Sequence, residues 1–375
     1  MISLNFDIQS FLKQHWQQKP IVIRNAIKDF EDPITADELA GLACEEEVSS
    51  RVVVTADNDW QIIQGPFEDY EQFGDQKWQL LVQAVNHWHP EIEPLVDAFR
   101  FIPDWRFDDV MVSFATPNGG VGPHIDNYDV FILQGEGQRA WKVGDRGNHQ
   151  QRNGDKTTAL VEDFEPIIEV TLNKGDILYI PPGYPHCGQT LTNAMSYSLG
   201  FRAPSQQELI SEVADFLIDN NSGLQRFTSD NETCVAGSVD EAHQQKLMGL
   251  LSALCSQPKA YQPILGQLLS RNRFDLDVSP DENIDPEALV DAIQAGAVIQ
   301  RIGGLKVLRL ENDAEKRLFI DGEPYSLSTT DESVLGYLSE NFLYENEWLL
   351  MNLDNTELQE FLVDILKMGY VYLSE

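Results

Sequence analysis

The chain has 375 residues, and its 42% hydrophobic and 23% charged residues are typical of a globular protein. This composition excludes an intrinsically disordered chain, and the length allows two or three domains with sizeable cores. No apolar run approaches the roughly 20 residues that cross a bilayer, and the N-terminal segment lacks the features of a secretory signal. The four cysteines are scattered and form no CxxC pair. We therefore expect a reducing compartment, the cytoplasm, and no membrane association.

The net charge is the one unusual bulk property. Asp and Glu number 61 against 26 Lys and Arg, which gives a formal net charge of −35. Such a field repels phosphate backbones and attracts cationic partners, so we expect no direct DNA binding. A solubility or salt-adaptation trait explains the same charge and stays open as an alternative.

The first 204 residues show mixed patterns followed by a series of short strands. Residues 1 to about 109 include a short amphipathic helix ahead of the extended segment 20–24. Turns rich in Gly, Pro and Asn then separate six β-rich runs, at 110–114, 130–133, 140–143, 167–170, 177–180 and 196–201. Many short strands punctuated in this way predict an antiparallel barrel or a double-sheet jelly roll.

The pattern becomes helical after Pro204. Ser205 and Glu208 form a capping box, and further helices are expected near 240–256 and 262–271. Three short helices carry more apolar surface here than they can hide among themselves. We expect a dimer interface, with a helical cap on the barrel as the alternative.

The region from about 276 onward has the pattern of a winged helix. A helix begins at Pro286, hairpin-like strands follow, and further helices are expected near 330–342 and 355–367. The last helix region is acidic and would face phosphates badly, so we expect a protein-contacting or structural module. The predicted fold class is α+β, a double-stranded β-helix of the cupin or jelly-roll type followed by helical and winged-helix parts. The predicted domains are 1–204, 205–275 and 276–375.

The most specific signal is a pair of motifs, GPHID at 122–126 and GDILYIPPGYPH at 175–186. On a strand, His124 and Asp126 point to the same face because they lie two residues apart. His186 follows a tight Pro-Pro-Gly turn, and a barrel could bring it back beside them. Two imidazoles and one carboxylate that leave three positions open form the facial triad of non-haem Fe(II) oxygenases. We therefore predict these three residues as metal ligands and catalytic residues.

Zinc is the alternative metal for these three ligands. The same atoms can hold it, but structural zinc normally recruits four ligands with cysteines among them. Cys187 points away from the triad if its strand is regular. The remaining five histidines lack a comparable setting, and we expect them on the surface or in the core.

Arg139 sharpens the choice of cofactor. It follows the 135–137 turn on what should be a neighbouring strand, and an inward-pointing arginine is costly unless it meets an anion. A guanidinium can bind a carboxylate with two parallel hydrogen bonds, which suits the distal carboxylate of 2-oxoglutarate. Ser113 could donate a supporting hydrogen bond. The alternatives are that Arg139 faces solvent beside Glu136, or that Arg202 is the anchor.

These motifs, together with the opening segment 16–26 (WQQKPIVIRNA), identify a resemblance. The chain resembles JmjC-type, cupin-fold 2-oxoglutarate oxygenases, and its three-part layout is similar to the bacterial ribosomal oxygenases. The resemblance implies Fe(II) on His124, Asp126 and His186, 2-oxoglutarate on Arg139 and Ser113, O₂ as co-substrate, and a homodimer. Most JmjC enzymes carry lysine where Arg139 stands, and arginine there resembles the ribosomal branch.

The resemblance also implies a substrate. Bacterial members hydroxylate the β-carbon of an arginine on large-subunit ribosomal protein number sixteen, and eukaryotic relatives hydroxylate a ribosomal histidine. A basic ribosomal protein would suit the acidic chain, and Asp108, Asp109 and Asp129 are candidates for binding its arginine. The alternatives are a ribosomal histidine hydroxylase, an N-methyl demethylase, a non-catalytic metal-binding cupin and a winged-helix regulator.

Overall fold

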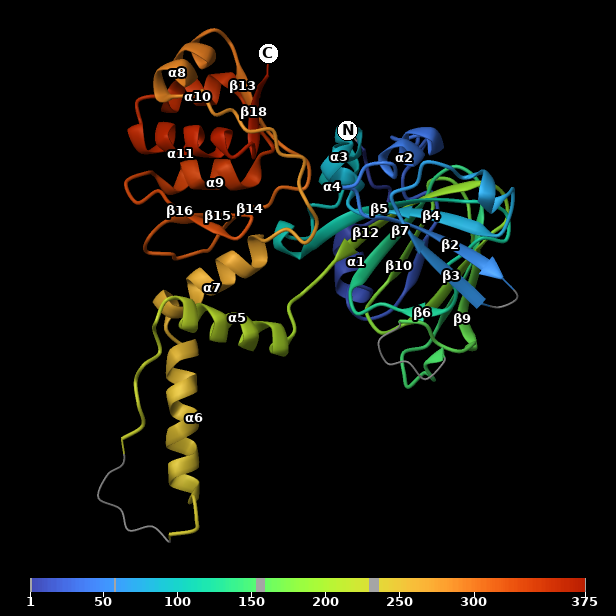
Figure 1. The fold of residues 1–375 in the computed structure, drawn as a ribbon, viewed down its shortest axis with the longest axis horizontal. Helices are drawn as coiled ribbons and strands as arrows, with labels where there is room; N and C mark the ends of the chain where they lie inside the picture. Colours follow the sequence, from blue (N-terminus) through green and yellow to red (C-terminus); the bar gives the residue numbers. More distant parts are fainter. Residues whose placement is uncertain (1, 57–58, 153–158, 229–235, 375) are drawn as a thin grey trace. The chain divides into compact units, whose positions relative to one another are not determined.

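The chain forms two compact units (Figure 1). The computed structural model describes residues 2–56, 59–152, 159–228 and 236–374. The first unit comprises Met1–Ala203, Asn272–Asp277 and Ile302–Gly304. The second comprises Pro204–Arg271, Val278–Arg301 and Leu305–Glu375. Of the helices in the described ranges, none is long and apolar enough to span a bilayer.

Two antiparallel sheets form the framework of the first unit (Figure 1). The larger sheet has eight strands in the order β1 (Ile21–Ile23), β10 (Ile177–Ile180), β7 (Asp129–Gln134), β12 (Ala194–Phe201), β5 (Phe107–Ala115), β4 (Trp78–Val82), β2 (Ser50–Ala56) and β3 (Asp59–Gln64). The smaller sheet has four strands in the order β6 (His124–Ile125), β11 (Pro185–Thr190), β8 (Arg139–Gly144) and β9 (Pro166–Leu172). Apolar side chains from both sheets, including Ile132 and Leu178 from the larger and Val143 from the smaller, pack together between them. The predicted jelly roll is confirmed.

The two faces of the larger sheet have different surroundings, because successive side chains on a strand point to opposite faces. One face, with Phe131 and Tyr197, packs into an aromatic core under the short helices of this unit. The other face, with Ile132 and Ser196, turns toward the smaller sheet. The short helical segments are α1 (Ile8–Gln14), α2 (Ala36–Leu42), α3 (Val85–Trp88), α4 (Glu93–Ala98), η1 (Glu71–Phe73), η2 (Pro90–Ile92) and η3 (Asp104–Arg106).

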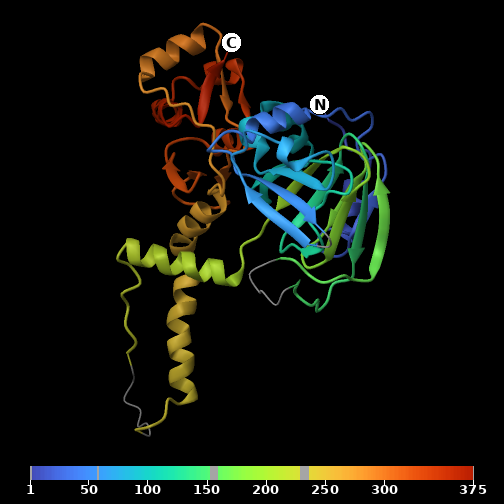
Figure 2. The ribbon, with the colours of Figure 1, turned by 45° about the vertical axis from the view of Figure 1, so that its right-hand side comes forward.

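The second unit combines long helices with two small sheets. Its helices are α5 (Gln206–Asp219), α6 (Glu241–Cys255), α7 (Pro258–Ser270), α8 (Pro286–Gln294), α9 (Glu332–Glu340), α10 (Asn346–Asn352) and α11 (Thr356–Lys367). Its strands are β13 (Val298–Arg301), β14 (Val307–Arg309), β15 (Arg317–Ile320), β16 (Glu323–Ser326), β17 (Leu343–Tyr344) and β18 (Val371–Ser374). They form the sheets β17-β13-β18 and β14-β15-β16. Neither α5 nor α6 has a buried residue, and Figure 2 shows α6 extending away from the sheets of this unit.

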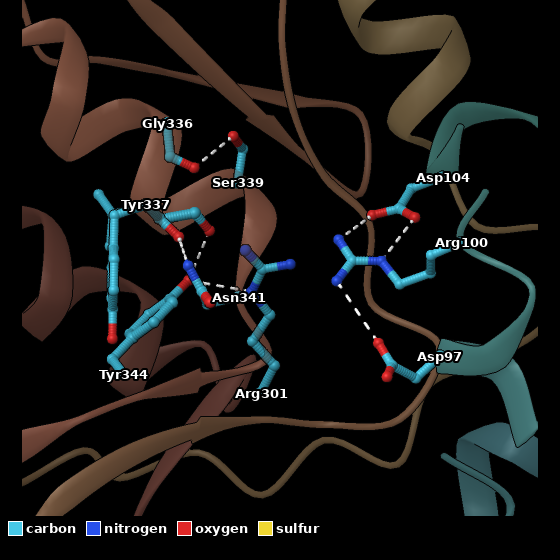
Figure 3. Close-up of polar contacts among 10 residues, drawn as sticks. Asp97, Arg100, Asp104, Arg301, Gly336, Tyr337, Ser339, Asn341 and Tyr344 are labelled. Atoms are coloured by element: carbon cyan, nitrogen blue, oxygen red, sulfur yellow. Dashed lines mark hydrogen bonds and ion pairs between the residues drawn. The ribbon is translucent and has the colours of Figure 1, made fainter. Parts of the chain in front are cut away.

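Each unit holds arginines in polar contacts of its own (Figure 3). In the first unit, Arg100 forms ion pairs with Asp104 at 2.7 Å and with Asp97 at 3.9 Å. In the second unit, the buried Arg301 donates from Nε to the Tyr344 hydroxyl at 3.0 Å.

The sequence patterns predicted most of these elements. All six predicted strands form, the capping box of α5 is present at Ser205 and Glu208, and α8 begins at Pro286. The elements that the patterns did not predict include β2, β3, β4 and α10. The division at 204 and 275 is finer than the two compact units and stays a prediction. Cys44, Cys187 and Cys255 have free thiols, and Cys234 lies outside the described residues.

Candidate metal centre and co-substrate pocket

Strand pairing brings the three predicted metal ligands together. His124 begins β6, Asp126 follows that strand directly, and His186 on β11 is paired opposite His124. The two imidazole centroids are 4.2 Å apart. Asp126 Oδ2 lies 3.9 Å from His124 Nε2 and 3.6 Å from His186 Nε2. Potential ligand atoms of all three residues lie within 4.8 Å of one another.

Backbone carbonyls orient both imidazoles for a metal. His124 Nδ1 lies 2.9 Å from the Gly122 carbonyl, and His186 Nδ1 lies 3.1 Å from the Tyr184 carbonyl. A carbonyl can only accept, so we assign the ring proton to Nδ1 in each case. The lone pair of each ring is then on Nε2, next to the Asp126 carboxylate.

The protonation state of His186 also suits a ligand. Burial is the main cause that lowers the pKa of this imidazole, to about 4, and the neighbouring His124 lowers it further, whereas Asp126 opposes the shift. His186 is therefore neutral at physiological pH and has no proton to lose before it binds a metal. Two imidazole nitrogens and one carboxylate fit Fe(II) with open coordination positions.

The Pro-Pro-Gly turn fixes the strand that carries His186. Gly183 has φ +86°, a conformation that other residues rarely adopt, and its N–H donates to the Asp126 carbonyl at 2.8 Å. The turn thereby ties the backbone of β11 to the segment that carries the carboxylate ligand. The Pro-Pro-Gly sequence therefore sets the backbone conformation that positions His186, in addition to preceding a metal-ligating side chain.

A pocket of about 430 Å³ opens from the three ligands into the interior between the sheets. Arg139 lines it and is 3% exposed, so the alternative of a solvent-facing arginine is wrong. Its Nε and Nη2 atoms are buried and have no hydrogen-bond partner among the described residues. Burial lowers the pKa of this guanidinium to about 10, which leaves it charged at neutral pH. A buried cation with unsatisfied donors calls for an anionic ligand.

Hydroxyl groups surround the same interior. Ser113 lines the pocket as expected, and Ser196 is paired opposite it on β12, with its buried hydroxyl also without a partner among the described residues. Sequence reasoning missed Ser196, although the register of two adjacent strands would have found it. Arg202, the rival anchor, does not line this pocket, and its backbone N–H donates to the Arg106 carbonyl instead.

A second cavity, of about 330 Å³, adjoins the first and shares Arg51, Met111 and Tyr128 with it. Asp109 lines this cavity and is 5% exposed. Burial, followed by the charge of Asp108, raises the pKa of the Asp109 carboxyl to about 6. Its Oδ2 accepts from the Ala84 N–H at 3.0 Å.

The other two carboxylates considered for the substrate have partners already. Asp108 forms an ion pair with Arg273 at 2.6 Å. Asp129 is buried and accepts from Tyr179, Gln17 and Arg106. The structure therefore leaves Asp109 as the carboxylate that faces the cavity.

This fold and this triad define the JmjC-type class of oxygenases, and comparison with known proteins agrees. A family model described as the JmjC domain matches residues 94–209, and one described as the ROXA-like winged helix matches residues 252–372. The winged-helix prediction is thereby confirmed.

Relatives that match over nearly the full length show which family of JmjC-type oxygenases the chain belongs to. The chain is 41% identical to the ribosomal protein uL16 3-hydroxylase of Escherichia coli K12, over 98% of both chains. It is 32% identical to a probable ribosomal oxygenase of Haemophilus influenzae, over 95% of this chain and 91% of that protein. The X-ray structure of E. coli YcfD superposes on the chain with a TM-score of 0.93 and 40% sequence identity. The structure of YcfD in complex with cobalt and 2-oxoglutarate superposes with a TM-score of 0.92 and 39% sequence identity. Each match covers all of both chains. The chain belongs to the ribosomal oxygenase family.

Proposed function

We propose that this chain is an Fe(II)- and 2-oxoglutarate-dependent hydroxylase that adds a hydroxyl group to the β-carbon of an arginine in ribosomal protein uL16. The observation that carries the proposal is the combination, in one pocket, of a histidine–aspartate–histidine triad and a buried arginine with unsatisfied donors. The similarity to a uL16 3-hydroxylase and to YcfD with cobalt and 2-oxoglutarate supports it.

The residues divide the task between the metal and the co-substrate. His124, Asp126 and His186 would hold Fe(II) through two imidazole nitrogens and one carboxylate. Arg139 would bind the far carboxylate of 2-oxoglutarate, and Ser113 would support it. When bound, Fe(II), 2-oxoglutarate and O₂ supply the oxidation that inserts oxygen into an unactivated C–H bond. The protein's part is to hold the target carbon beside the metal and to exclude water.

The second cavity suits an arginine side chain. Its acidic group, Asp109, is buried, so a guanidinium entering there would meet a carboxylate in an environment of low polarity, where the attraction is strong. In the amide orientation that satisfies both neighbours, Gln83 donates to Asp109 Oδ2 at 2.8 Å and accepts from Arg51 at 3.0 Å. These contacts fix Oδ2, so Asp109 Oδ1 is the atom that would receive the substrate.

A direct experiment tests the substrate and the chemistry together. Purified enzyme is incubated with uL16, Fe(II), 2-oxoglutarate and ascorbate, and tryptic fragments are analysed by mass spectrometry. We expect a mass gain of one oxygen on one arginine, absent with His124→Ala and present with His149→Ala, which changes a half-buried histidine outside the triad. Oxygen on a histidine would move the enzyme to the other branch of the family. Loss of a methyl group with formaldehyde release would identify a demethylase, and no consumption of 2-oxoglutarate would leave a metal-binding cupin.

The same proposal includes a cytoplasmic homodimer that does not bind DNA. Ile210, Ile218, Met248 and Leu251 on α5 and α6 are 49–75% exposed, which is a large apolar surface for an isolated chain. We expect Ile218→Asp to shift the protein from dimer to monomer in analytical ultracentrifugation, with Asp219→Asn as the matched control. A wild-type protein that sediments as a monomer would overturn the dimer.

A further inference from the structure

Strand β3 forms one edge of the larger sheet of the first unit (Figure 1). Among the described residues, it pairs in that sheet with β2 alone, with Val53 opposite Ile62 and Thr55 opposite Trp60. An edge strand presents backbone donors and acceptors that can pair with another chain.

The register shows which backbone groups of β3 face outward. Thr55 N–H donates to the Lys77 carbonyl on the β4 side of β2, whereas Ser50 accepts from the Gly65 N–H on the β3 side. Bonding directions alternate along a strand, so residues 59, 61 and 63 bond β2. The N–H and C=O groups of Ile62 and Gln64 therefore point away from the sheet. Within the described ranges, no hydrogen bond joins them to another residue.

This open edge runs beside the metal site. The side chains of Trp60 and Ile62 line the same pocket as the three metal ligands. Trp60 lies against Gly122, where an added Cβ would come within 2.6 Å of its ring. The carbonyl of Gly122 is the group that orients His124. A chain laid along β3 would therefore pass over the mouth of the pocket.

The residues of β3 itself carry none of the usual protection. Natural proteins blunt exposed edges with lysine, proline or a covering loop. The strand has the sequence DWQIIQ, which contains neither lysine nor proline, and Ile62 is 54% exposed. Its one charged residue, Asp59, is acidic, and the exposed Asp163 lines a groove together with Trp60. The Trp60 ring already stacks on the guanidinium of Arg152 at 4.7 Å, so a cation is accommodated here.

We propose that an extended, basic segment of the protein substrate adds to the sheet as a strand beside β3. The substrate residue opposite Ile62 directs its side chain into the metal pocket, because residues paired across two strands project to the same face. Its neighbours on either side project away from the pocket. The inference rests on the proposed function, since it takes a polypeptide as the substrate.

The charge of the chain favours this occupant over a second copy. At a net charge of −35, the chain attracts a basic segment, whereas a second copy brings the same negative charge to this edge. The apolar surface of α5 and α6, and not this edge, is where we expect a second copy to bind. Backbone pairing also tolerates different side chains, so the side chain that enters the pocket is the one that decides specificity.

The test uses substrate peptides in which single backbone nitrogens are methylated. The full chain, loaded with Co²⁺ and 2-oxoglutarate, is first titrated with peptides of about 15 residues that tile uL16, a length that exceeds a usual strand. Each N–H of the tightest peptide is then methylated in turn. We expect affinity to fall about tenfold at alternate positions and to change little between them, because every second N–H faces β3. A loss without alternation, or no loss at any position, would overturn the pairing.

A variant of the enzyme gives a second, independent measurement. Ile62→Pro removes an outward N–H, at an edge position where proline is tolerated, and Ile62→Ala keeps the N–H but shortens the side chain. We expect the proline variant to bind peptide about tenfold more weakly than the alanine variant. Gln61→Ala, on the opposite face of β3, should have no effect. Equal affinities of the two Ile62 variants, or a change in oligomeric state instead, would overturn the proposal.

The two claims fail separately in these experiments. If the unmodified peptide is hydroxylated with Fe(II) but the methylation pattern does not alternate, the strand pairing is wrong and the function stands. If binding alternates but no hydroxylation occurs, the pairing holds and the proposed reaction is wrong. Absence of binding by every uL16 peptide overturns the pairing.

Discussion

Two buried arginines in the first unit have opposite surroundings. Arg106 forms an ion pair with Asp129 at 3.1 Å, donates to the Arg202 carbonyl, and packs over Trp16 at the edge of the aromatic core. Arg139, on the smaller sheet, has two nitrogens without a hydrogen-bond partner among the described residues. A protein can bury a charge when it is paired, and an unpaired one costs stability. The contacts within the fold account for the burial of Arg106, whereas the burial of Arg139 is accounted for by a bound anionic ligand.

The same contrast extends over the two faces of the larger sheet. On the aromatic side, the hydroxyls of Tyr179 and Tyr197 donate to Asp129 and Asp32. On the side of the smaller sheet, Ser196, Trp141 and Gln134 each have a buried polar atom without a partner in the described part of the chain. Satisfied groups mark the part of the sheet that holds the fold together. Unsatisfied atoms also occur on the aromatic side, at His15 and Asn86, but those of Arg139 and Trp141 line the metal pocket and mark the part that awaits a ligand.

The largest effect should come from the metal ligands. His186→Ala removes one of three ligands, so we expect uL16 hydroxylation to fall by at least about a thousandfold and Co²⁺ affinity to fall with it. The far-UV circular dichroism should not change, because an alanine fits on β11. Activity that survives in this variant would show that the triad does not hold the metal.

Asp109→Asn should impair hydroxylation less than His186→Ala does, and it should make the folded protein more stable. Losing the buried carboxylate should raise KM for uL16 about a hundredfold, because the guanidinium loses a charged partner. For the wild type, KM should rise as the pH falls through about 6, the pKa to which burial raises this carboxyl, whereas the variant should show no such dependence.

Linkage gives the sign of the stability change. The folded protein binds the Asp109 proton more tightly than the unfolded chain, whose carboxyl has a pKa of about 3.9, so the ionised group lowers stability above pH 6. We expect Asp109→Asn to raise the free energy of unfolding at pH 7.5 by up to about 3 kcal/mol, and the gain should vanish near pH 4. A variant that is less stable at pH 7.5 would show that the carboxylate serves the fold.

A pair of hydroxyl deletions sharpens the comparison between the two faces of the sheet. Tyr179→Phe removes a satisfied donor and leaves Asp129 short of a hydrogen bond, so it should lower the free energy of unfolding by about 1–2 kcal/mol. Ser196→Ala removes an unsatisfied hydroxyl, so stability should stay within about 0.5 kcal/mol. Chemical denaturation measures both changes. Equal losses of stability in Tyr179→Phe and Ser196→Ala would show that the two faces of the sheet do not differ in this way.

Sequence alone pointed to the candidate site because the proposed ligands belong to short motifs with a local geometry. The two-residue spacing of His124 and Asp126 and the turn before His186 needed only strand parity and turn chemistry. The sequence also predicts an inward-pointing Arg139, and its 3% exposure in the structure agrees.

The parts that sequence reasoning missed depend on contacts between distant segments. Strand β4 is buried along its whole length, so it shows none of the alternation that predicts a strand. Ser196 acquires its place only through the pairing of β12 with β5. Asp109 could not be separated from Asp108 and Asp129 until their partners were known, since all three are acidic residues near one end of the barrel.

The most direct measurement compares wild-type protein with Arg139→Met, using 2-oxoglutarate titration calorimetry on the Co²⁺-loaded form and chemical denaturation of the metal-free form. We expect 2-oxoglutarate affinity to fall by at least about a hundredfold, because the far carboxylate loses its bidentate partner. Without ligand, the variant should be more stable by up to about 3 kcal/mol, since the unpaired buried charge is gone. Lys142→Met, on the outer face of the same strand, should change neither quantity. Unchanged 2-oxoglutarate affinity, or a loss of stability in the metal-free variant, would contradict the assignment of the unsatisfied interior to the co-substrate.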